Sequence, residues 1–425
     1  MKNWFYLILF LSITNGLLAQ TRFEKIDDLV TFCQDNNMFN GNILVAEKGK
    51  IIYQQSVGQA DFDNNIPLND NTSFCLGSIS KQFTAFAIML LKQQGKLEYS
   101  TTIGEIFPEF PKYMHDITLK NLIQHTSGLK RTHYGEQDGL KNEEIYQNFI
   151  KAKGEKLLFK SGTDLRYSNS GFMMLAMVVE KVSGQSFESF LTENAWKPLG
   201  MTNTYVMSEE DYNRHNRAIG FDGFGKKDDF NVLTYGSNGI YSTTGDLCKW
   251  MQSFNTDLLM DLEDRSEAWQ PATTNDGKLL PHSVGGYQWY YGFGLYLGKD
   301  NLQGMIGHSG AYGGFFNAML QDLKNERSVV ILTNNGRILP VMDMAVIVQK
   351  ILSNDSYTLP KVSIDLELRK KHYNDIDAAI QYYHQLKKDH PSKYKFDNEW
   401  ELNRLAYALM HEERYEDAIK IIKLL

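Results

Sequence analysis

The 425-residue sequence has few cysteines, no strongly basic stretch and no glycine after Gly336. Its three cysteines, Cys33, Cys75 and Cys248, are too few and too widely spaced for a disulfide framework or a zinc cluster. The formal charge of −7, from 44 Lys+Arg and 51 Asp+Glu, argues against a nucleic-acid partner, because binding phosphates requires clustered Lys and Arg. The sequence contains neither His-Glu-x-x-His nor Gly-Lys followed by Ser or Thr, so it implies no metal and no cofactor.

The chain has enough apolar side chain for a large core, since 42% of its residues are hydrophobic and 12% aromatic. Its first segment combines Lys2, an apolar run over 4–11 and small residues up to Ala19. This pattern predicts a signal peptide over 1–19, and therefore a periplasmic or secreted protein. An uncleaved membrane anchor is the alternative, but the apolar run is short for a bilayer. We expect the mature form to have no stable membrane span.

The distribution of glycine and charge predicts two regions. All 33 glycines lie at or before Gly336, whereas residues 361–425 carry 12 Lys/Arg and 12 Asp/Glu. We therefore expect a compact mixed domain over 20–353, a linker over 354–360 and a helical segment over 361–425.

The helical segment contains a weak repeat. Ala-Ile pairs at 379–380 and 418–419 lie in patterns similar to tetratricopeptide units, although their spacing of 39 residues exceeds the usual 34. A plain helical hairpin is an equally good interpretation. Either structure could serve as a docking surface for a protein partner.

The large domain combines strand and helix patterns. Two strands are expected over 41–53, joined at 47–50, and a buried strand is expected over 328–335. Helices are expected over 80–94 and 171–182. Strands at both ends with helices between them predict an α+β fold whose antiparallel sheet is completed by both ends of the domain.

The first candidate for chemistry is the tetrad Ser78-Ile79-Ser80-Lys81, which opens the expected helix. Residues i and i+3 share a helix face, so the Lys81 ammonium can reach the Ser78 hydroxyl. A neighbouring amine is one way to activate a hydroxyl nucleophile. Alone, the tetrad is equally consistent with a serine N-cap and an exposed lysine.

Two further elements strengthen this candidate. Tyr167-Ser168-Asn169 leads into the second helix, where a tyrosine hydroxyl can pass a proton and an asparagine amide can hold a carbonyl. The third element is His308-Ser309-Gly310-Ala311, whose small residues would let a substrate lie against a strand edge near a backbone N–H donor. Taken alone, the Tyr167 element would be a capped turn and the His308 element a glycine-rich loop.

In this order the three elements resemble the serine beta-lactamase and penicillin-binding-protein superfamily, and most of all class C beta-lactamases and related esterases and D-amino-acid peptidases. The stretches 125–129, 198–201 and 236–243 strengthen the resemblance, which covers residues 39–335. It implies a beta-lactamase/transpeptidase-like antiparallel sheet flanked by helices, together with an all-helical subdomain. His125, in the first of these stretches, is expected to be structural.

The resemblance also implies roles. Ser78 would be the acylated nucleophile, Lys81 its proton partner and Tyr167 the general base and acid. Asn169 would orient the substrate, and the backbone N–H groups of Ser78 and Ala311 would form the oxyanion hole.

The sharpest departure from the family pattern lies in the third element, where Lys-Thr-Gly is usual. His308, Ser309 and Gly310 stand there instead, as candidate substrate-binding residues. An imidazolium at His308 could replace the lysine charge at low pH, because a free imidazole has a pKa near 6.5. The alternative is that His308 only fills space beside the strand.

Together these patterns predict an exported serine hydrolase that forms an acyl-enzyme on Ser78 and acts on an ester, an amide or a lactam. The substrate would be a small molecule or a peptide, with pocket walls from residues 211–232 and 276–291. The alternative is a non-catalytic module that binds cell-wall peptides or a protein and docks through its helical tail.

Overall fold

The structure is a computed structural model that describes residues 21–130, 140–223, 225–230, 233–336 and 338–425. The chain forms two compact units, Gly41–Ser353 and a second unit that combines residues up to Asn40 with Asn354–Leu425. The large unit thus begins at Gly41, whereas the glycine and charge distribution predicts a domain over 20–353. The predicted signal peptide lies outside the described residues. Within those ranges, no helix is long and apolar enough to cross a membrane.

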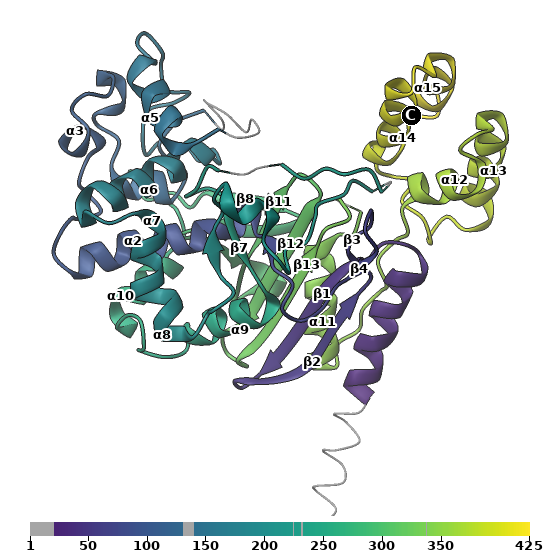
Figure 1. Cartoon of the computed structure of the whole chain (residues 1–425), viewed down its shortest axis with the longest axis horizontal. Helices are drawn as coiled ribbons and strands as arrows, with labels where there is room; N and C mark the ends of the chain where they lie inside the picture. Colours follow the sequence, from purple (N-terminus) through teal and green to yellow (C-terminus); the bar gives the residue numbers. More distant parts are fainter. Residues whose placement is uncertain (1–20, 131–139, 224, 231–232, 337) are drawn as a thin grey trace, which may run out of the picture. The chain divides into compact units, whose positions relative to one another are not determined.

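An eight-stranded sheet forms the centre of the large unit (Figure 1). Its strand order is β2-β1-β13-β12-β11-β10-β9-β8, and every neighbouring pair is antiparallel. The fold is α+β with an antiparallel sheet, as predicted. The strands are β1 (Gly41–Glu47), β2 (Lys50–Val57), β8 (Pro281–Val284), β9 (Tyr287–Tyr291), β10 (Tyr296–Gly298), β11 (Met305–Tyr312), β12 (Phe315–Asp322) and β13 (Arg327–Thr333).

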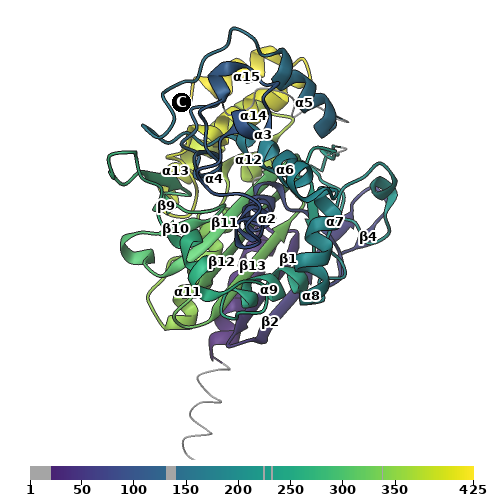
Figure 2. The same cartoon turned by 90° about the vertical axis from the view of Figure 1, so that its left-hand side faces the viewer.

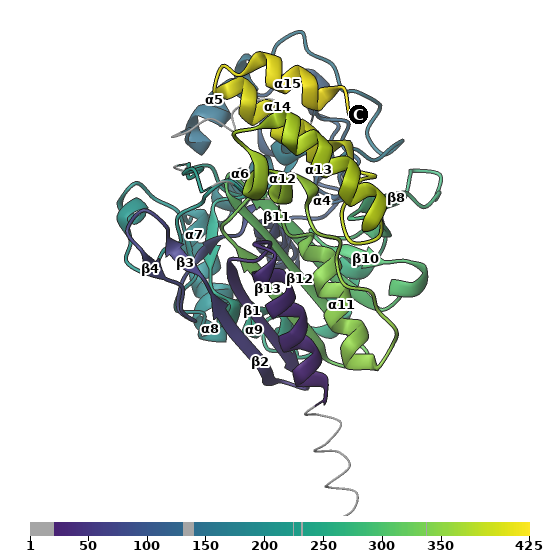
Figure 3. The ribbon, with the colours of Figure 1, turned by 90° about the vertical axis from the view of Figure 1, so that its right-hand side faces the viewer.

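The first and last strands of the unit are neighbours in this sheet, where β1 pairs with β13 along its whole length next to the edge strand β2. Every residue of β13 after Arg327 is buried, so both faces of the strand are covered, which explains its continuous apolar run. Helix α9 (Thr244–Ser253) packs Cys248 against Leu44 and Ala46 of β1. Helix α11 (Val341–Ser353) lies against β12 and β13 (Figure 3).

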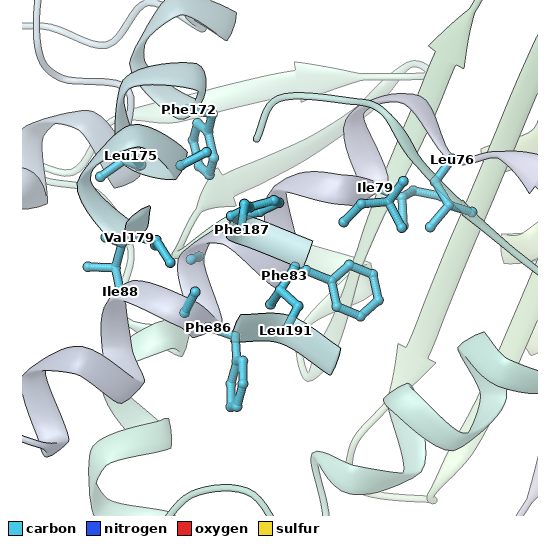
Figure 4. Packing of buried hydrophobic residues seen from close by; sticks show 14 of the residues in the cluster. Leu76, Ile79, Phe83, Phe86, Ile88, Phe172, Leu175, Val179, Phe187 and Leu191 are labelled. Carbon is cyan, nitrogen blue, oxygen red and sulfur yellow. The ribbon is translucent and has the colours of Figure 1, made fainter. Parts of the chain in front are cut away.

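Helices α2 (Lys81–Gln93), α6 (Asn169–Ser183) and α7 (Phe187–Leu191) gather on one side of the sheet (Figures 1 and 2). Helix α6 ends at Gly184, whose left-handed φ of 72° suits glycine. Apolar side chains of the three helices form a fully packed core (Figure 4), including Phe83, Ile88, Phe172, Leu175, Val179, Phe187 and Leu191. This core fixes the end of α2 that carries the candidate nucleophile.

The C-terminal segment is helical, with α12 (Ile364–His372), α13 (Ile376–Asp389), α14 (Glu399–His411) and α15 (Tyr415–Ile422). Consecutive helices contact one another, α12 with α13 and α14 with α15. Helices are therefore present where the sequence predicts them. Their assignment as tetratricopeptide-like units stays a prediction.

Candidate active site

Ser78 and Lys81 lie where strand β5 (Phe74–Cys75) turns into α2 through a 3-10 helix, Gly77–Ser80. Side chains three residues apart eclipse one another in a 3-10 helix, so Ser78 and Lys81 project in the same direction. The Lys81 Nζ donates to the Ser78 Oγ at 3.0 Å. The whole Lys81 residue is buried, with 0% of its surface exposed. A buried amine in contact with a hydroxyl is the arrangement that activates a serine.

A second contact fixes the lysine. Its Nζ donates at 2.8 Å to the backbone carbonyl of Ser237. Ser237 lies shortly before strand β7 (Ile240–Ser242), which pairs with β5, so this carbonyl is attached to the same small sheet as the nucleophile. The Lys81 Nζ also lies 4.8 Å from the ring centroid of Tyr167, which brings the second predicted element to the first.

Glycines let strand β11 approach the nucleophile closely. A Cβ at Gly310 would lie 1.9 Å from the carbonyl oxygen of Leu76, and a Cβ at Gly77 would lie 2.7 Å from the backbone nitrogen of Ala311. Gly77 also has a φ of 53°, which favours glycine. Gly310 therefore acts through backbone packing and is not part of the cavity wall.

The register of β11 directs the Ala311 N–H toward the nucleophile. Tyr312 and Phe315 close a two-residue hairpin, and Ala311 pairs with Phe316 next to it. In an antiparallel ladder, hydrogen-bonded and non-hydrogen-bonded pairs alternate, so the N–H of Ala311 points away from β12. On that side lies Gly77, directly before Ser78. The backbone N–H of Ala311 therefore faces the segment that carries Ser78.

A cavity of about 360 Å³ opens above the Ser78 hydroxyl. No Asp, Glu, Lys or Arg is found among the described residues that line it. The lining residues are Ser78, Tyr167, Asn169, Phe230, His282, Tyr296, Ser309, Ala311, Tyr312 and Gly313. Five of the eight residues predicted for the site therefore line one cavity, and Lys81 reaches it through Ser78.

His308 does not reach the cavity. Its ring is buried and stacks on Tyr296, with 4.1 Å between ring centroids and 17° between planes. The Nδ1 lies 2.5 Å from the carbonyl oxygen of Ser309, which can only accept, so Nδ1 carries the proton. The Nε2 then accepts from the Tyr291 hydroxyl at 3.3 Å.

The environment of His308 favours the neutral imidazole. Burial and the nearby charge of Lys81 both lower its pKa well below the ordinary value of 6.5. The hypothesis of an imidazolium that replaces the family's lysine charge disagrees with this environment. Burial could not be deduced from the motif, and it reverses the expected protonation.

Sequence comparison assigns the family. The sequence model of the Beta-lactamase family matches residues 26–344, about three quarters of the chain. The chain belongs to the beta-lactamase family. Penicillin-binding protein 4* of Bacillus subtilis (strain 168) is 27% identical over 340 residues, which cover 75% of this chain and 73% of that protein.

Solved structures show the same beta-lactamase fold. An octameric penicillin-binding protein homologue from Pyrococcus abyssi has a TM-score of 0.69 at 23% identity, covering 82% of each chain. A beta-lactamase/D-alanine carboxypeptidase from Yersinia pestis, solved with citrate, has a TM-score of 0.67 at 22% identity, covering 80% of this chain and 99% of that one. These structures support the fold of this beta-lactamase-family protein.

Several residues of this beta-lactamase-family site could not be identified individually from the sequence. Phe230 and His282 fall in the two segments predicted for the pocket walls, but nothing marked them individually. Their positions depend on tertiary packing. Ser237 stood in a motif that strengthened the family resemblance, yet its carbonyl contact with Lys81 could not be foreseen.

His282 adds a second imidazole to this site. It lies on β8, and its ring is nearly parallel to that of Tyr167, with 6.1 Å between centroids. Burial lowers its pKa below 6.5, so the ring is neutral at pH 7. It therefore presents a polar but uncharged edge to a substrate. Among the residues described, no group of three or more His, Cys, Asp or Glu could hold a metal ion.

Proposed function

We propose that this protein is an exported serine hydrolase that forms an acyl-enzyme on Ser78 and acts on an ester, an amide or a lactam. The observation that carries the proposal is the 3.0 Å contact between the Lys81 Nζ and the Ser78 Oγ beneath a cavity that Tyr167 also lines. The Ser78 nucleophile, its proton acceptor and the oxyanion donors would then surround the substrate carbonyl, as acyl transfer requires.

In the acylation step, the Ser78 Oγ attacks the substrate carbonyl carbon while its proton passes to the Lys81–Tyr167 pair. The carbonyl oxygen becomes an oxyanion and accepts from the backbone N–H groups of Ser78 and Ala311. Asn169, the first residue of α6, lies on the same wall and holds the amide or ester group.

The tetrahedral intermediate then collapses. The bond from carbon to the leaving oxygen or nitrogen breaks, and the leaving group takes the proton from Tyr167. Water next attacks the acyl-enzyme, with Tyr167 accepting its proton, and the proton finally returns to the Ser78 Oγ as the acid leaves. Throughout these proton transfers, Lys81 keeps its hydrogen bonds to the Ser78 Oγ and to the backbone carbonyl of Ser237.

Uncharged substrates fit this cavity better than anionic ones. Aromatic rings of Tyr167, Phe230, Tyr296 and Tyr312 line it, and the imidazoles of His282 and His308 are neutral at pH 7. A carboxylate placed there would lose its hydration without gaining a cationic partner from the described lining residues.

Covalent labelling tests the proposed nucleophile. A fluorophosphonate probe should label the wild type, and Ser78→Ala should abolish labelling. Ser283→Ala is the control, because Ser283 is an exposed serine of β8 outside the cavity lining and should leave the label in place. No label on the wild type, or equal label on Ser78→Ala, would contradict the acyl-enzyme proposal and favour the non-catalytic alternative.

Paired esters test the substrate preference. We expect kcat/KM for p-nitrophenyl butyrate to exceed that for mono-p-nitrophenyl glutarate by about tenfold, a loss of roughly 1.4 kcal/mol for the unpaired carboxylate. Nitrocefin and D-alanyl peptides extend the series to lactams and amides. An equal or reversed ratio would contradict the preference without affecting the acyl-enzyme proposal.

Export rests on the sequence pattern before Gln20. Mass spectrometry of protein recovered from the periplasm or the medium should show a chain that begins near Gln20. A chain that retains Met1, or protein confined to the cytoplasm, would contradict export.

A further inference from the structure

His125 holds the backbone on both sides of Tyr167. Its carbonyl oxygen accepts from the N–H of Arg166 at 2.9 Å, and its Nδ1 accepts from the N–H of Ser168 at 3.1 Å. A single residue thus receives hydrogen bonds from the residue before the tyrosine and the residue after it. Nothing in the tetrad or Tyr-x-Asn patterns assigns this arrangement.

The His125 ring also supports the tyrosine side chain. Its centroid lies 4.2 Å from that of Tyr167, 4.5 Å from that of Tyr291 and 5.1 Å from that of Phe172. His125 is fully buried and does not line the cavity. Any effect on the reaction must therefore pass through its neighbours.

The ring has one defined protonation state. Since Nδ1 accepts an N–H, it carries no proton, so the neutral ring is protonated at Nε2. Burial, with the charge of Lys81 as the next cause, lowers the pKa of His125 well below 6.5. Nε2 has no hydrogen-bond partner among the residues the structure describes. Among the described residues, the hydrogen bond from the Ser168 N–H is therefore the one found for the His125 ring.

The backbone conformation of His125 also supports a role in holding the Tyr167 segment. His125 has a φ of 59°, a left-handed conformation that is uncommon for residues other than glycine, although histidine adopts it more often than most. Strain of this kind persists where the surroundings require it, often at functional sites. The conformation lets one residue offer both its carbonyl and its Nδ1 to the Tyr167 segment.

We infer that His125 is a positioning residue that holds the Tyr167 hydroxyl in the place needed for proton transfer at Ser78. The inference rests on the proposed function, in which Tyr167 is the general base. A small displacement of a base is costly, because proton transfer requires hydrogen-bond distance.

Two substitutions separate hydrogen bonding from packing. His125→Asn keeps an acceptor at the δ1 position and suits the left-handed backbone. His125→Leu keeps much of the volume but removes the acceptor. We expect His125→Leu to lower kcat for a neutral p-nitrophenyl ester by about a hundredfold, the lower range for general-base catalysis. KM should stay within about threefold of wild type, since His125 touches no substrate, and His125→Asn should recover at least about tenfold of the lost kcat.

The decisive measurement is a cycle with Tyr167→Phe. If His125 acts through Tyr167, His125→Leu should have almost no further effect on kcat once the hydroxyl is gone. Independent, additive losses would overturn the inference, as would equal kcat values for His125→Leu and wild type. Ser78→Ala and Tyr167→Phe test the proposed function separately: full turnover in either variant would contradict that proposal instead.

A measurement on the wild type covers the case in which His125→Leu fails to fold. Nitrogen-15 NMR of histidine-labelled protein should show one ring protonated at Nε2 and unprotonated at Nδ1 between about pH 5.5 and 8, a range around the free histidine pKa. A resonance for His125 with the proton at Nδ1, or with a normal titration, would overturn the inference.

Discussion

The two compact units of this protein obtain their structure in different ways. In the large unit, strands from its two ends pair within one sheet, and the cavity combines residues from Ser78 to Gly313. The C-terminal helices contact their neighbours in the chain, as α14 contacts α15, and also pack across the segment, as α12 does with α14 and α13 with α15. The first arrangement depends on backbone pairing between strands and the second on side-chain packing between helices.

The two units also differ in how they cover apolar side chains. The core of the large unit contains fully buried residues such as Phe83 and Phe172. The C-terminal helices leave Trp400, Tyr415 and Ile419 more than half exposed. Catalysis requires the environment found in the large unit, where charged and polar groups are held in place and water is excluded. The second offers apolar surface, consistent with the docking role predicted for the tail.

The largest expected effect tests the claim that the chemistry depends on a few buried contacts of the large unit. Lys81→Ala should lower the acylation rate by about a thousandfold, because it removes the proton partner of Ser78 and the contact with Ser237. Stopped-flow release of p-nitrophenol measures this rate. Lys92→Ala is the matched control on the same helix, where the lysine pairs with Glu267 near the surface and should matter less than twofold. Comparable losses in the two variants would remove Lys81 from the relay.

A second prediction concerns the buried ion pair that anchors one cavity wall. Arg217 binds Asp229 through two hydrogen bonds of 2.9 Å, and the two side chains are at most 1% exposed. Asp229→Ala would leave a buried guanidinium without its partner, so the free energy of unfolding should fall by about 3 kcal/mol or more. Urea denaturation measures this change. Asp211→Ala, which breaks the exposed pair with Arg214, should cost less than about 1 kcal/mol.

Asp229 also precedes Phe230 in the cavity wall, so its loss should raise KM for aromatic esters. A destabilisation below 1 kcal/mol would show that long-range contacts contribute less to the large unit than its burial indicates.

The sequence predicted those parts of the site that depend on local spacing. Ser78 and Lys81 are three residues apart at a helix start, so their contact follows from helical geometry alone. Strands β1, β2 and β13 were recognisable from apolar runs and turns, and the antiparallel sheet followed from their positions.

The remainder depends on packing between distant segments. His282, on strand β8, and Phe230 reach the cavity only through the packing of distant segments, and no periodic pattern in the sequence records that. The neutrality of His308 follows from burial beside Tyr296, which shifts a pKa in the direction opposite to a motif-based expectation. His125 was expected to be structural, and its backbone contacts with Arg166 and Ser168 became visible only in three dimensions.

A third prediction uses the buried histidines of the large unit. His125 and His308 have folded-state pKa values lowered well below 6.5, whereas in the unfolded chain both should titrate near 6.5. Above that pH both states are neutral and the stability is fully present. As pH falls below 6.5, the unfolded chain takes up protons that the folded unit refuses, so the free energy of unfolding decreases.

Between pH 6.5 and 5.5 the two histidines together should account for a loss of about 2 kcal/mol. Urea denaturation at half-unit steps of pH measures it, and His308→Gln should reduce the loss by about 1 kcal/mol. A stability that is constant or rises toward pH 5.5 would mean that these rings are charged in the folded unit.

The smallest expected effect tests most directly whether catalysis is confined to the large unit. All residues that line the described cavity lie between Ser78 and Gly313, and the C-terminal helices contribute none of them. Deletion of residues 361–425 should therefore change kcat/KM for a neutral ester by less than about twofold, a change below roughly 0.4 kcal/mol. The urea midpoint of the shortened protein, followed by near-ultraviolet circular dichroism, shows whether the large unit remains folded. A folded protein with a tenfold lower kcat/KM would show that the tail takes part in catalysis, and the division between a catalytic unit and an accessory helical unit would then be wrong.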